Sequence, residues 1–148
     1  MHYTIKKLTR TDVALAKQLI EAWHTDDGAT QVIYPREKYL NKLLTKKSFH
    51  AYVAIMGDQV VGGLTAYEME MFDTEETEMF LFEIGVNKEA RQQGIATALI
   101  EALKQTCYQQ HIAIIFVGTS MDNEAAKKLY AKTGGSLEIT PFYTYELK

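Results

Sequence analysis

The feature that most constrains this sequence is a glycine-containing loop between a long apolar segment and an amphipathic helix. Met79–Val86 is almost wholly apolar, which predicts a central strand covered on both faces. The loop Arg91–Ala96 follows, and apolar residues then recur at helical spacing from Ile95 to a point near His111. Because Ile112–Val117 is apolar again, the segment predicts a strand, helix, strand unit with parallel strands. The sequence therefore predicts an α/β fold.

The loop has the composition of an anion site. Successive backbone N–H groups in such a loop, together with the positive end of the helix dipole, suit a pyrophosphate. Gly94 would let a phosphate approach the backbone closely. By itself the loop is equally consistent with an ordinary turn, because it matches neither the GxGxxG dinucleotide pattern nor the GxxxxGK[ST] phosphate loop.

The other segments complete one α/β domain. Alternating or apolar runs predict strands over 2–8, 49–55, 60–67, 137–140 and 142–147, and helices are predicted after Thr9, after Pro35 and after Asp122. A glycine turn joins 49–55 to 60–67 as an antiparallel hairpin. A chain of 148 residues has room for one domain of ordinary size.

Charge and composition argue against several classes of protein. Sixteen Lys and Arg against nineteen Asp and Glu give a net charge of −3, so no global cationic field gathers nucleic acid or an anionic membrane. One cysteine and four scattered histidines do not provide metal-ligand spacing, and we expect no metal site. Charges throughout the first twenty residues leave no apolar stretch for a signal peptide or a membrane span, which predicts a cytoplasmic protein.

Two motifs indicate a family. Val86–Ala96 resembles the acetyl-CoA pyrophosphate loop of the GNAT N-acetyltransferase superfamily, where a strand end precedes [RQ]-x-x-G-x-[GA]. Asn123–Gly134 resembles the second signature of that superfamily, N-x-x-A-x-x-L-Y-x-K-x-G, at every fixed position. The resemblance implies a single GNAT domain over residues 1–148. It also implies a mixed sheet of about seven strands flanked by about four helices, splayed between the fourth and fifth strands.

Within that superfamily the sequence is most similar to the aminoglycoside 3-N-acetyltransferases. Residues 39–44, 60–67, 82–86 and 93–100 carry this similarity. The sequence departs from the pattern of those enzymes at Glu83, Gln92 and Asn123, where aspartate, arginine and aspartate are usual. The resemblance implies direct transfer of an acetyl group from acetyl-CoA to a primary amine in a ternary complex.

The resemblance also implies which residues bind the cofactor. Backbone groups of Ile84 and Val86 would pair with the pantetheine arm, and the loop would hold the pyrophosphate. The residues expected to bind acetyl-CoA are Ile84, Gly85, Val86, Arg91, Gln92, Gln93, Gly94, Ile95, Ala96, Asn123 and Tyr130. Tyr130 would also protonate the leaving CoA thiolate, although packing on one helical face is the commoner role of a tyrosine in a helix.

Glu83 is the expected general base. A carboxylate inside an apolar strand is costly to bury unpaired, and partial desolvation would favour the protonated form that a base must reach near neutrality. The alternative is a structural carboxylate that is hydrogen-bonded within the sheet or to a neighbouring side chain.

The acceptor is expected to be a polycationic amine. Seven acids and no Lys or Arg occupy residues 68–83. An acidic rim concentrates polycations such as aminoglycosides and polyamines, although a solvated hairpin edge explains Asp73–Glu76 equally well. The candidate substrate-binding residues are Glu68, Glu70, Asp122 and Tyr145.

Two alternative functions stay open. The acceptor could be a peptide, a protein or a simple polyamine, and a wide groove with little acidic lining would favour a peptide. The chain could also be a CoA-binding sensor without catalysis, but the presence of both Glu83 and Tyr130 argues against this. We also expect a homodimer, because the aromatic segment Phe142–Tyr145 could join the sheet of a partner.

Overall fold

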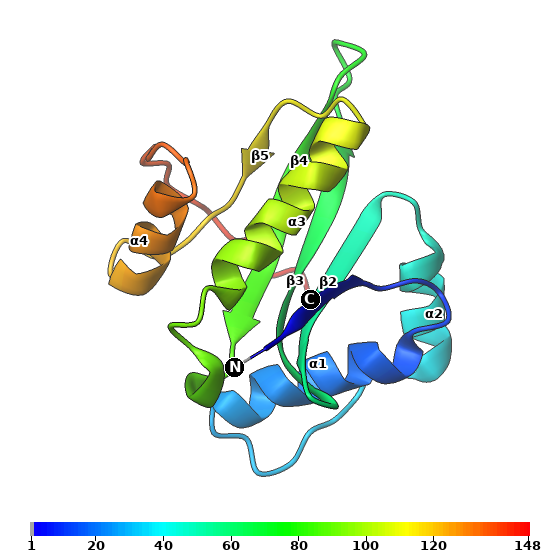
Figure 1. Cartoon of the computed structure of the whole chain (residues 1–148). Coiled ribbons are helices and arrows are strands. Elements are labelled where there is room, and N and C mark those ends of the chain that lie inside the picture. Colours follow the sequence, from blue (N-terminus) through cyan, green and yellow to red (C-terminus); the bar gives the residue numbers. More distant parts are fainter. Residues whose placement is uncertain (1) are drawn as a thin grey trace. The chain divides into compact units, whose positions relative to one another are not determined.

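One mixed sheet organises the chain up to Gly118 in the computed structural model, which describes residues 2–148 (Figure 1). Five strands are formed among these residues, and they lie in the sheet in chain order. They are β1 (Thr4–Lys7), β2 (Phe49–Met56), β3 (Gln59–Glu70), β4 (Thr77–Val86) and β5 (Ile115–Phe116). The strands β1 to β4 pair antiparallel, and β5 joins β4 in parallel, as the strand, helix, strand unit predicts.

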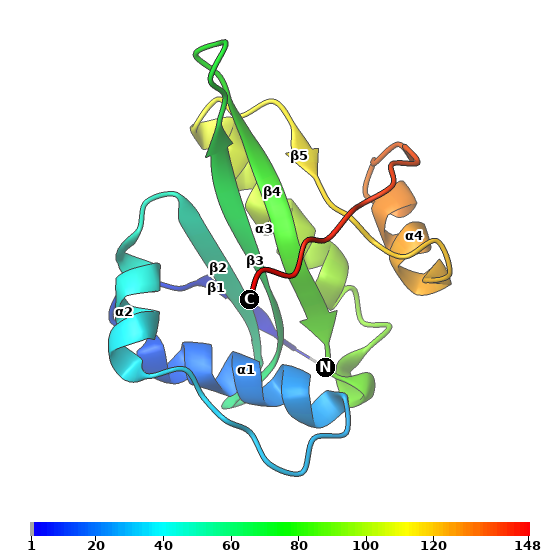
Figure 2. The same cartoon turned by 180° about the vertical axis from the view of Figure 1, so that it is seen from behind.

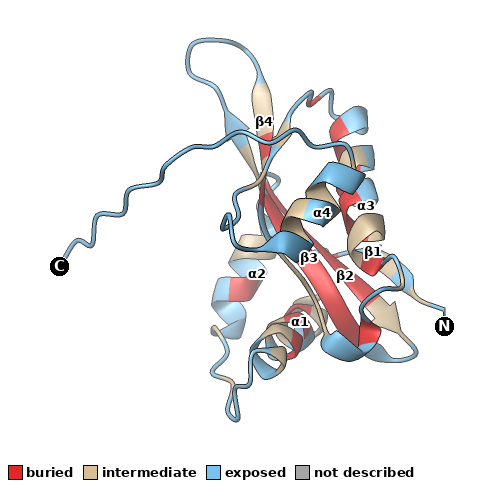
Figure 3. Ribbon diagram, turned by 90° about the vertical axis from the view of Figure 1, so that its left-hand side faces the viewer, coloured by how far each residue is buried: buried red, intermediate tan, exposed pale blue. Residues whose placement is uncertain are grey.

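Helices cover both faces of this sheet (Figures 1 and 2). They are α1 (Val13–Asp26) and α2 (Glu37–Thr45) on one face, α3 (Ile95–Gln109) on the other, and the short 3-10 turn η1 (Lys88–Ala90). The core on the α3 side includes Leu64, Leu81, Leu99 and Leu103, all nearly or fully buried. Figure 3 shows this buried band along the strands and along the inner side of α3.

A close approach fixes α1 on the sheet. Gly63 of β3 has no room for a side chain, because a Cβ there would lie 2.7 Å from Leu19 of α1 and would also collide with the Tyr52 carbonyl of β2. Leu19 therefore packs directly on the backbone of β3. This contact sets the distance between α1 and the strands that carry the candidate site.

A β-bulge interrupts the ladder between β3 and β4. Thr65 pairs with Glu83, but the next residue of β3, Ala66, pairs with Leu81, so Phe82 is an extra residue on β4. A bulge of this kind turns two successive side chains toward one face of the sheet. It explains why Glu83 shares a face with Thr65 even though alternation from Met79 and Leu81 would place Glu83 on the opposite face.

The two parallel strands separate after a short contact. Only Met79 and Phe80 of β4 pair with Ile115 and Phe116 of β5 among the described residues, whereas β4 itself continues to Val86. β5 is thus shorter than the apolar run 112–117 predicts, and the second half of β4 has an open edge on that side. The splay expected between the fourth and fifth strands lies at this position.

The smaller unit, Thr119–Lys148, contains one helix, α4 (Glu124–Lys132). The side chain of Asn123 caps the helix by accepting from the N–H of Ala126 at 3.0 Å, and Gly134 ends it with a φ of +101°. The two final strands expected at 137–140 and 142–147 are not formed. A strand requires a hydrogen-bonded neighbour, and alternation of side chains alone does not supply one. The described sheet therefore has five strands rather than about seven.

The contacts of the chain divide it into the unit that ends at Gly118 and the unit that begins at Thr119. The interpretation as a single domain over 1–148 stays a prediction. Within residues 2–148, every helix is too short or too polar to cross a membrane.

Candidate active site

Glu83 lies on the sheet face that α1 and α2 cover, and its carboxylate has one fixed partner. The hydroxyl of Thr65 donates to Oε1 of Glu83 at 2.7 Å. Thr65 is buried, whereas Glu83 is exposed to solvent. The burial expected for Glu83 is therefore wrong, because the bulge turns the side chain away from the α3 core. Thr65 thus holds one oxygen of an otherwise exposed carboxylate.

Aromatic rings surround this carboxylate on the same face. The rings of Tyr67 and Phe82 meet edge to face with centroids 5.7 Å apart, and Tyr67 also meets Phe49 at 5.1 Å. Burial raises the pKa of Tyr67, and the nearby Glu83 carboxylate and Tyr39 raise it further. The Tyr67 phenol therefore stays neutral around pH 7. Phe82 remains 54% exposed, which leaves an apolar surface beside Glu83.

The open edge of β4 presents backbone groups next to Glu83. The N–H of Asn87 donates to the Val61 carbonyl of β3 at 2.8 Å. Because backbone groups alternate in direction along a strand, the N–H groups of Ile84 and Val86 point to the other side, where β5 has diverged. These are the two residues expected to pair with the pantetheine arm. The geometry fits that role.

The loop before α3 has the backbone shape of an anion site. Gln92 and Gly94 both adopt left-handed conformations, with φ of +62° and +82°. Gly94 is the N-cap of α3 and supplies no side-chain cap, and its carbonyl accepts from the N–H of Ala98 at 2.9 Å. Backbone N–H groups at the start of such a helix lack intrahelical partners. The residues from Arg91 to Ala96 therefore fit a pyrophosphate.

The guanidinium of Arg91 has two partners within the protein. Its Nε donates to the Val86 carbonyl at 2.8 Å, and its Nη2 donates to Oδ2 of Asp26 at 2.7 Å. The neighbouring amide of Gln93 has a buried Oε1 atom with no hydrogen-bond partner among the described residues. Gly85 is confined by Trp23, whose indole Nε1 donates to the Gly85 carbonyl at 3.1 Å and would lie 2.9 Å from a Cβ at Gly85.

Glu68 lies on the opposite face of the sheet from Glu83. It hydrogen-bonds His50 of β2, with 2.6 Å between Oε2 and Nε2. His50 is almost wholly buried, and burial lowers the pKa of His50 although the bond to Glu68 opposes this. The Nδ1 atom of His50 is buried and has no hydrogen-bond partner among the described residues, which agrees with a neutral ring that donates from Nε2. The structure does not bring Glu68 together with Glu83.

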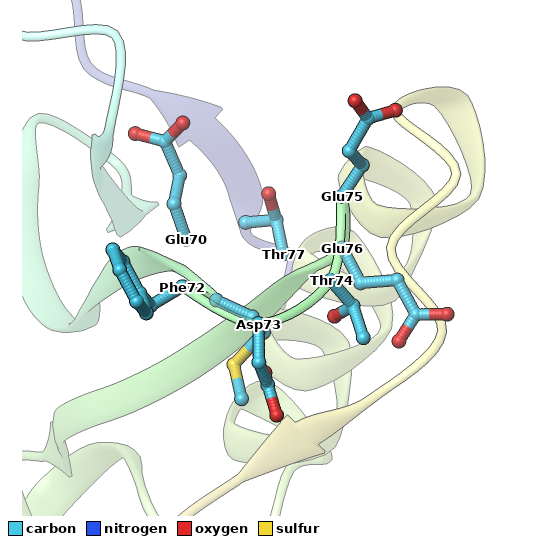
Figure 4. A pocket seen from close by; sticks show the side chains of 8 residues that line it. Glu70, Phe72, Asp73, Thr74, Glu75, Glu76 and Thr77 are labelled. Atoms are coloured by element: carbon cyan, nitrogen blue, oxygen red, sulfur yellow. The ribbon is translucent and has the colours of Figure 1, made fainter.

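Glu70 lies near the tip of the β3–β4 hairpin, where most of the acidic side chains gather. An open hollow of about 460 Å³ is lined by residues 70–77, and its acidic side chains point away from the ribbon (Figure 4). Phe72 is fully exposed there. Thr77 and Glu83 lie six positions apart on β4, which corresponds to about 20 Å along a strand. The hollow is therefore distinct from the surface around Glu83.

The remaining candidates lie in the smaller unit. Asn123 uses its side-chain oxygen to cap α4, and the N–H of the exposed Asp122 donates to Oγ of Ser120 at 3.2 Å. Tyr130 is half-buried, and burial raises the pKa of its phenol. Tyr145 is 85% exposed. The signature residues thus shape α4 and its ends.

A family model, the acetyltransferase (GNAT) family, matches residues 14–135. The chain belongs to the GNAT acetyltransferase family. It is therefore an acetyltransferase, as the two motifs indicate. No curated protein sequence matches it.

Solved structures similar to this GNAT acetyltransferase cover nearly its whole length. One is an aminoglycoside acetyltransferase from an uncultured soil metagenomic sample in complex with sisomicin, with 26% identity and a TM-score of 0.92, covering 99% of this chain and 97% of that one. Another soil metagenomic aminoglycoside acetyltransferase has 32% identity and a TM-score of 0.89, covering 99% and 100%. The aminoglycoside N-acetyltransferase AAC(6')-Iy in complex with CoA has 19% identity and a TM-score of 0.75, covering 99% and 96%, and shares the fold.

Sequence reasoning missed two residues that shape this site. Thr65 and Trp23 gave no signal, because their contacts with Glu83 and Gly85 depend on strand register and on helix packing across 18 and 62 positions of the chain. From the sequence, Asp26 is a weak candidate for contact with the acceptor, whereas in the structure its carboxylate bonds the Lys88 N–H and Arg91. The described residues contain no group of three or more His, Cys, Asp or Glu placed to hold a metal ion.

Proposed function

We propose that this GNAT acetyltransferase moves an acetyl group from acetyl-CoA to a primary amine of an aminoglycoside-like polycationic small molecule. The observation that carries the proposal is the position of Glu83. Its exposed carboxylate directly precedes Ile84, whose N–H group points to the open edge of β4. The chain also aligns over nearly its whole length with two aminoglycoside acetyltransferases. The donor and the acceptor would then meet at the same strand.

The residues present fit acetyl-CoA. The N–H groups of Ile84 and Val86 would hold the pantetheine arm at the open edge of β4, and the loop from Arg91 to Ala96 would hold the pyrophosphate through its backbone. Bound acetyl-CoA supplies an activated acetyl thioester. An N–H group of β4 directed at the thioester carbonyl would stabilise the negative charge that develops on that oxygen.

Glu83 would take the proton from the amine, directly or through one water. Thr65 holds Oε1 at 2.7 Å, so Oε2 is the oxygen that faces the acceptor. Only the free amine attacks, and aminoglycoside amines are mostly protonated at pH 7, so a carboxylate that accepts a proton increases the reactive fraction. The exposed ring of Phe82 offers an apolar surface to a sugar ring beside this carboxylate.

Tyr130 is assigned as the group that protonates the leaving thiolate. The assignment rests on the signature that the segment from Asn123 to Gly134 matches. Its phenol is kept neutral by the burial that raises its pKa, and a proton donor must be in this form. The proposed contact of Asn123 with acetyl-CoA would involve its amide nitrogen, since its oxygen caps α4.

Acidic residues would steer the acceptor rather than bind its reacting amine. Glu68 is engaged by His50, while Glu70 and the hairpin tip lie in the acidic stretch that a polycation meets first. Asp122 and Tyr145 remain proposed contacts. The similarity to the 3-N-acetyltransferases in particular also remains a proposal, and one similar solved structure, AAC(6')-Iy, is a 6'-N-acetyltransferase by name.

We further propose a homodimer. The C-terminal segment exposes apolar side chains that a lone chain leaves in water: Leu137, Ile139, Phe142, Tyr143, Tyr145 and Leu147. Strand pairing with a second copy would cover them. Light scattering should give twice the mass of one chain, and a mass of one chain at micromolar concentration would contradict the dimer.

A thiol-release assay with acetyl-CoA tests the proposed function. The amines to compare are sisomicin, spermidine and a peptide with a free N-terminus. The proposal expects kcat/KM to be highest for sisomicin. A preference for the peptide would favour a protein acceptor, and acetyl-CoA binding without turnover of any amine would favour the sensor alternative.

Gly94→Val tests the cofactor loop separately. Valine cannot adopt the φ of +82° without strain, and its side chain would occupy the position of the phosphate. We expect acetyl-CoA binding to weaken greatly in calorimetry while the fold is retained. Unchanged affinity would contradict the loop assignment.

A further inference from the structure

The end of α1 is joined to the cofactor loop by hydrogen bonds that the proposed reaction does not use. Asp26, the last residue of α1, accepts from the backbone N–H of Lys88 at 2.9 Å and from Nη2 of Arg91 at 2.7 Å. Nε of Arg91 donates to the Val86 carbonyl at 2.8 Å. One carboxylate and one guanidinium thus connect α1, the end of β4 and the start of the loop. We call these bonds the Asp26 latch.

The loop next to the latch holds an unfavourable backbone conformation. Gln92 follows Arg91 directly and has a φ of +62°, which residues with a side chain rarely adopt. Such a conformation persists only where the surrounding structure enforces it. The same conformation helps to turn successive N–H groups toward one point, so the shape that fits a pyrophosphate needs support from outside the loop.

The latch has the geometry to give this support. The side chain of Asp26 is only 15% exposed and accepts a backbone N–H as well as the guanidinium, which fixes its orientation. Arg91 is 52% exposed, but its Nε and Nη2 atoms point toward β4 and α1. A fully exposed ion pair contributes little to stability. A largely buried carboxylate that accepts two hydrogen bonds, by contrast, restrains both of the groups that donate them.

We propose that Asp26 and Arg91 are positioning residues, and that the Asp26 latch holds the loop from Arg91 to Ala96 in its phosphate-binding shape before the ligand arrives. The identity of that ligand as acetyl-CoA rests on the proposed function. The restraint itself does not, because all of its bonds lie within the protein.

Hydrogen exchange of the ligand-free protein tests the restraint. Asp26→Asn removes the charge but keeps the size, so the hydrogen-bonded backbone amides of Arg91 and Ala98, at the two ends of the loop, should exchange about tenfold faster than in the wild type. The amides of Leu99 and Leu103 in the core of α3 should not change. Asp27→Asn makes the same change at the next position and should have no effect on the loop. Equal loop exchange in the Asp26→Asn variant and the wild type would overturn the proposal.

Arg91→Gln tests the latch from its other end. If the two side chains act together, the double variant should exchange no faster at the loop than the faster single variant. Additive effects would contradict a shared latch. If Asp26→Asn folds poorly, Arg91→Gln still tests the latch, because it removes the same ion pair from the other side.

Acetyl-CoA affinity then tests what the restraint is for. Calorimetry at about 0.5 M salt is the decisive condition, because at low salt the loss of a carboxylate near the pyrophosphate would itself favour an anion. Asp26→Asn should raise the Kd for acetyl-CoA by about five- to tenfold at high salt, and Asp27→Asn should not. An unchanged Kd would overturn the positioning role. If the wild type itself fails to bind acetyl-CoA, the proposed function fails, whereas hydrogen exchange still decides the latch.

Discussion

Two glutamates on neighbouring strands differ in what surrounds them. Glu83 of β4 and Glu68 of β3 each bond a side chain eighteen positions away in the sequence, Thr65 and His50 respectively. Glu83 lies exposed on the face of α1 and α2. Glu68 lies on the α3 face, where its side chain is 18% exposed and its partner His50 is buried.

The difference follows from one residue. If β4 ran through Phe82 without the bulge, regular alternation would carry Glu83 to the α3 face with Met79 and Leu81. The bulge places Glu83 where a substrate can reach it, whereas the regular part of the ladder keeps Glu68 against the core. In this sheet, the largely buried carboxylate of Glu68 therefore has a structural role, and the solvent-exposed carboxylate of Glu83 is the candidate for catalysis.

Substitution of each glutamate by glutamine should separate the two roles. At pH 7, Glu83→Gln should lower kcat/KM for the acceptor by about 10²–10³-fold, since it removes the proton acceptor and keeps the shape. Glu68→Gln should leave kcat/KM within about threefold and lower the free energy of unfolding by about 1 kcal/mol. Steady-state kinetics and urea unfolding measure both. A larger loss of activity in Glu68→Gln than in Glu83→Gln would contradict the assignment of the catalytic role to Glu83 and the structural role to Glu68.

The bond from Thr65 offers a finer test of Glu83. Thr65→Val keeps the shape of the buried side chain but removes the donor to Oε1. We expect kcat/KM to fall about tenfold, because Oε1 of Glu83 loses the donor that orients the carboxylate. Thr65→Ser should restore most of the activity. An unchanged kcat/KM in Thr65→Val would mean that the hydroxyl serves packing alone.

The acidic hairpin tip should affect the rate at which the acceptor associates with the enzyme and not the acetyl-transfer step. Neutralising Asp73, Glu75 and Glu76 together should lower kcat/KM for a polycationic acceptor by about two- to fivefold at low salt. Added salt should remove most of that difference, because exposed charges are screened within about 10 Å. An equal loss for a monoamine would assign these charges to solubility.

The pair on the α3 face should show itself in the pH dependence of stability. Burial lowers the pKa of His50 in the folded protein, so the unfolded chain binds more protons as pH falls below about 6.5. His50 therefore contributes stability above that pH, and this contribution is lost as pH falls through its folded pKa. Relative to wild type, His50→Gln should unfold with a weaker pH dependence between pH 7 and 5. His24→Gln, at an exposed position of α1, should behave like wild type.

The sequence allowed much of the site to be predicted because the cofactor signal is local. The apolar strand, the glycine loop and the helix from Ile95 are contiguous, and period and loop composition identify each of them. The splay between the fourth and fifth strands was expected from the resemblance to the GNAT superfamily. Glu83 was identified because it is the only charge within the run from Met79 to Val86.

Register and pairing could not be predicted in the same way. The bulge at Phe82 and the bond between Glu68 and His50 depend on which residues of two strands lie opposite each other, and a single strand does not specify this. For the same reason the alternation in 137–147 predicted strands that have no partner in the described chain.

The pH dependence of the Glu83→Gln defect tests the central claim most directly. The rates of wild type and Glu83→Gln with sisomicin and acetyl-CoA are to be compared from pH 6 to a pH above that at which the acceptor amines lose their protons. If Glu83 takes the proton from the amine, the deficit of about 10²–10³-fold at pH 7 should shrink toward unity as solvent supplies free amine. A deficit that stays constant across this range would contradict proton transfer and assign Glu83 to substrate placement. Wild-type rates at pH 7 would show that the carboxylate has a structural role.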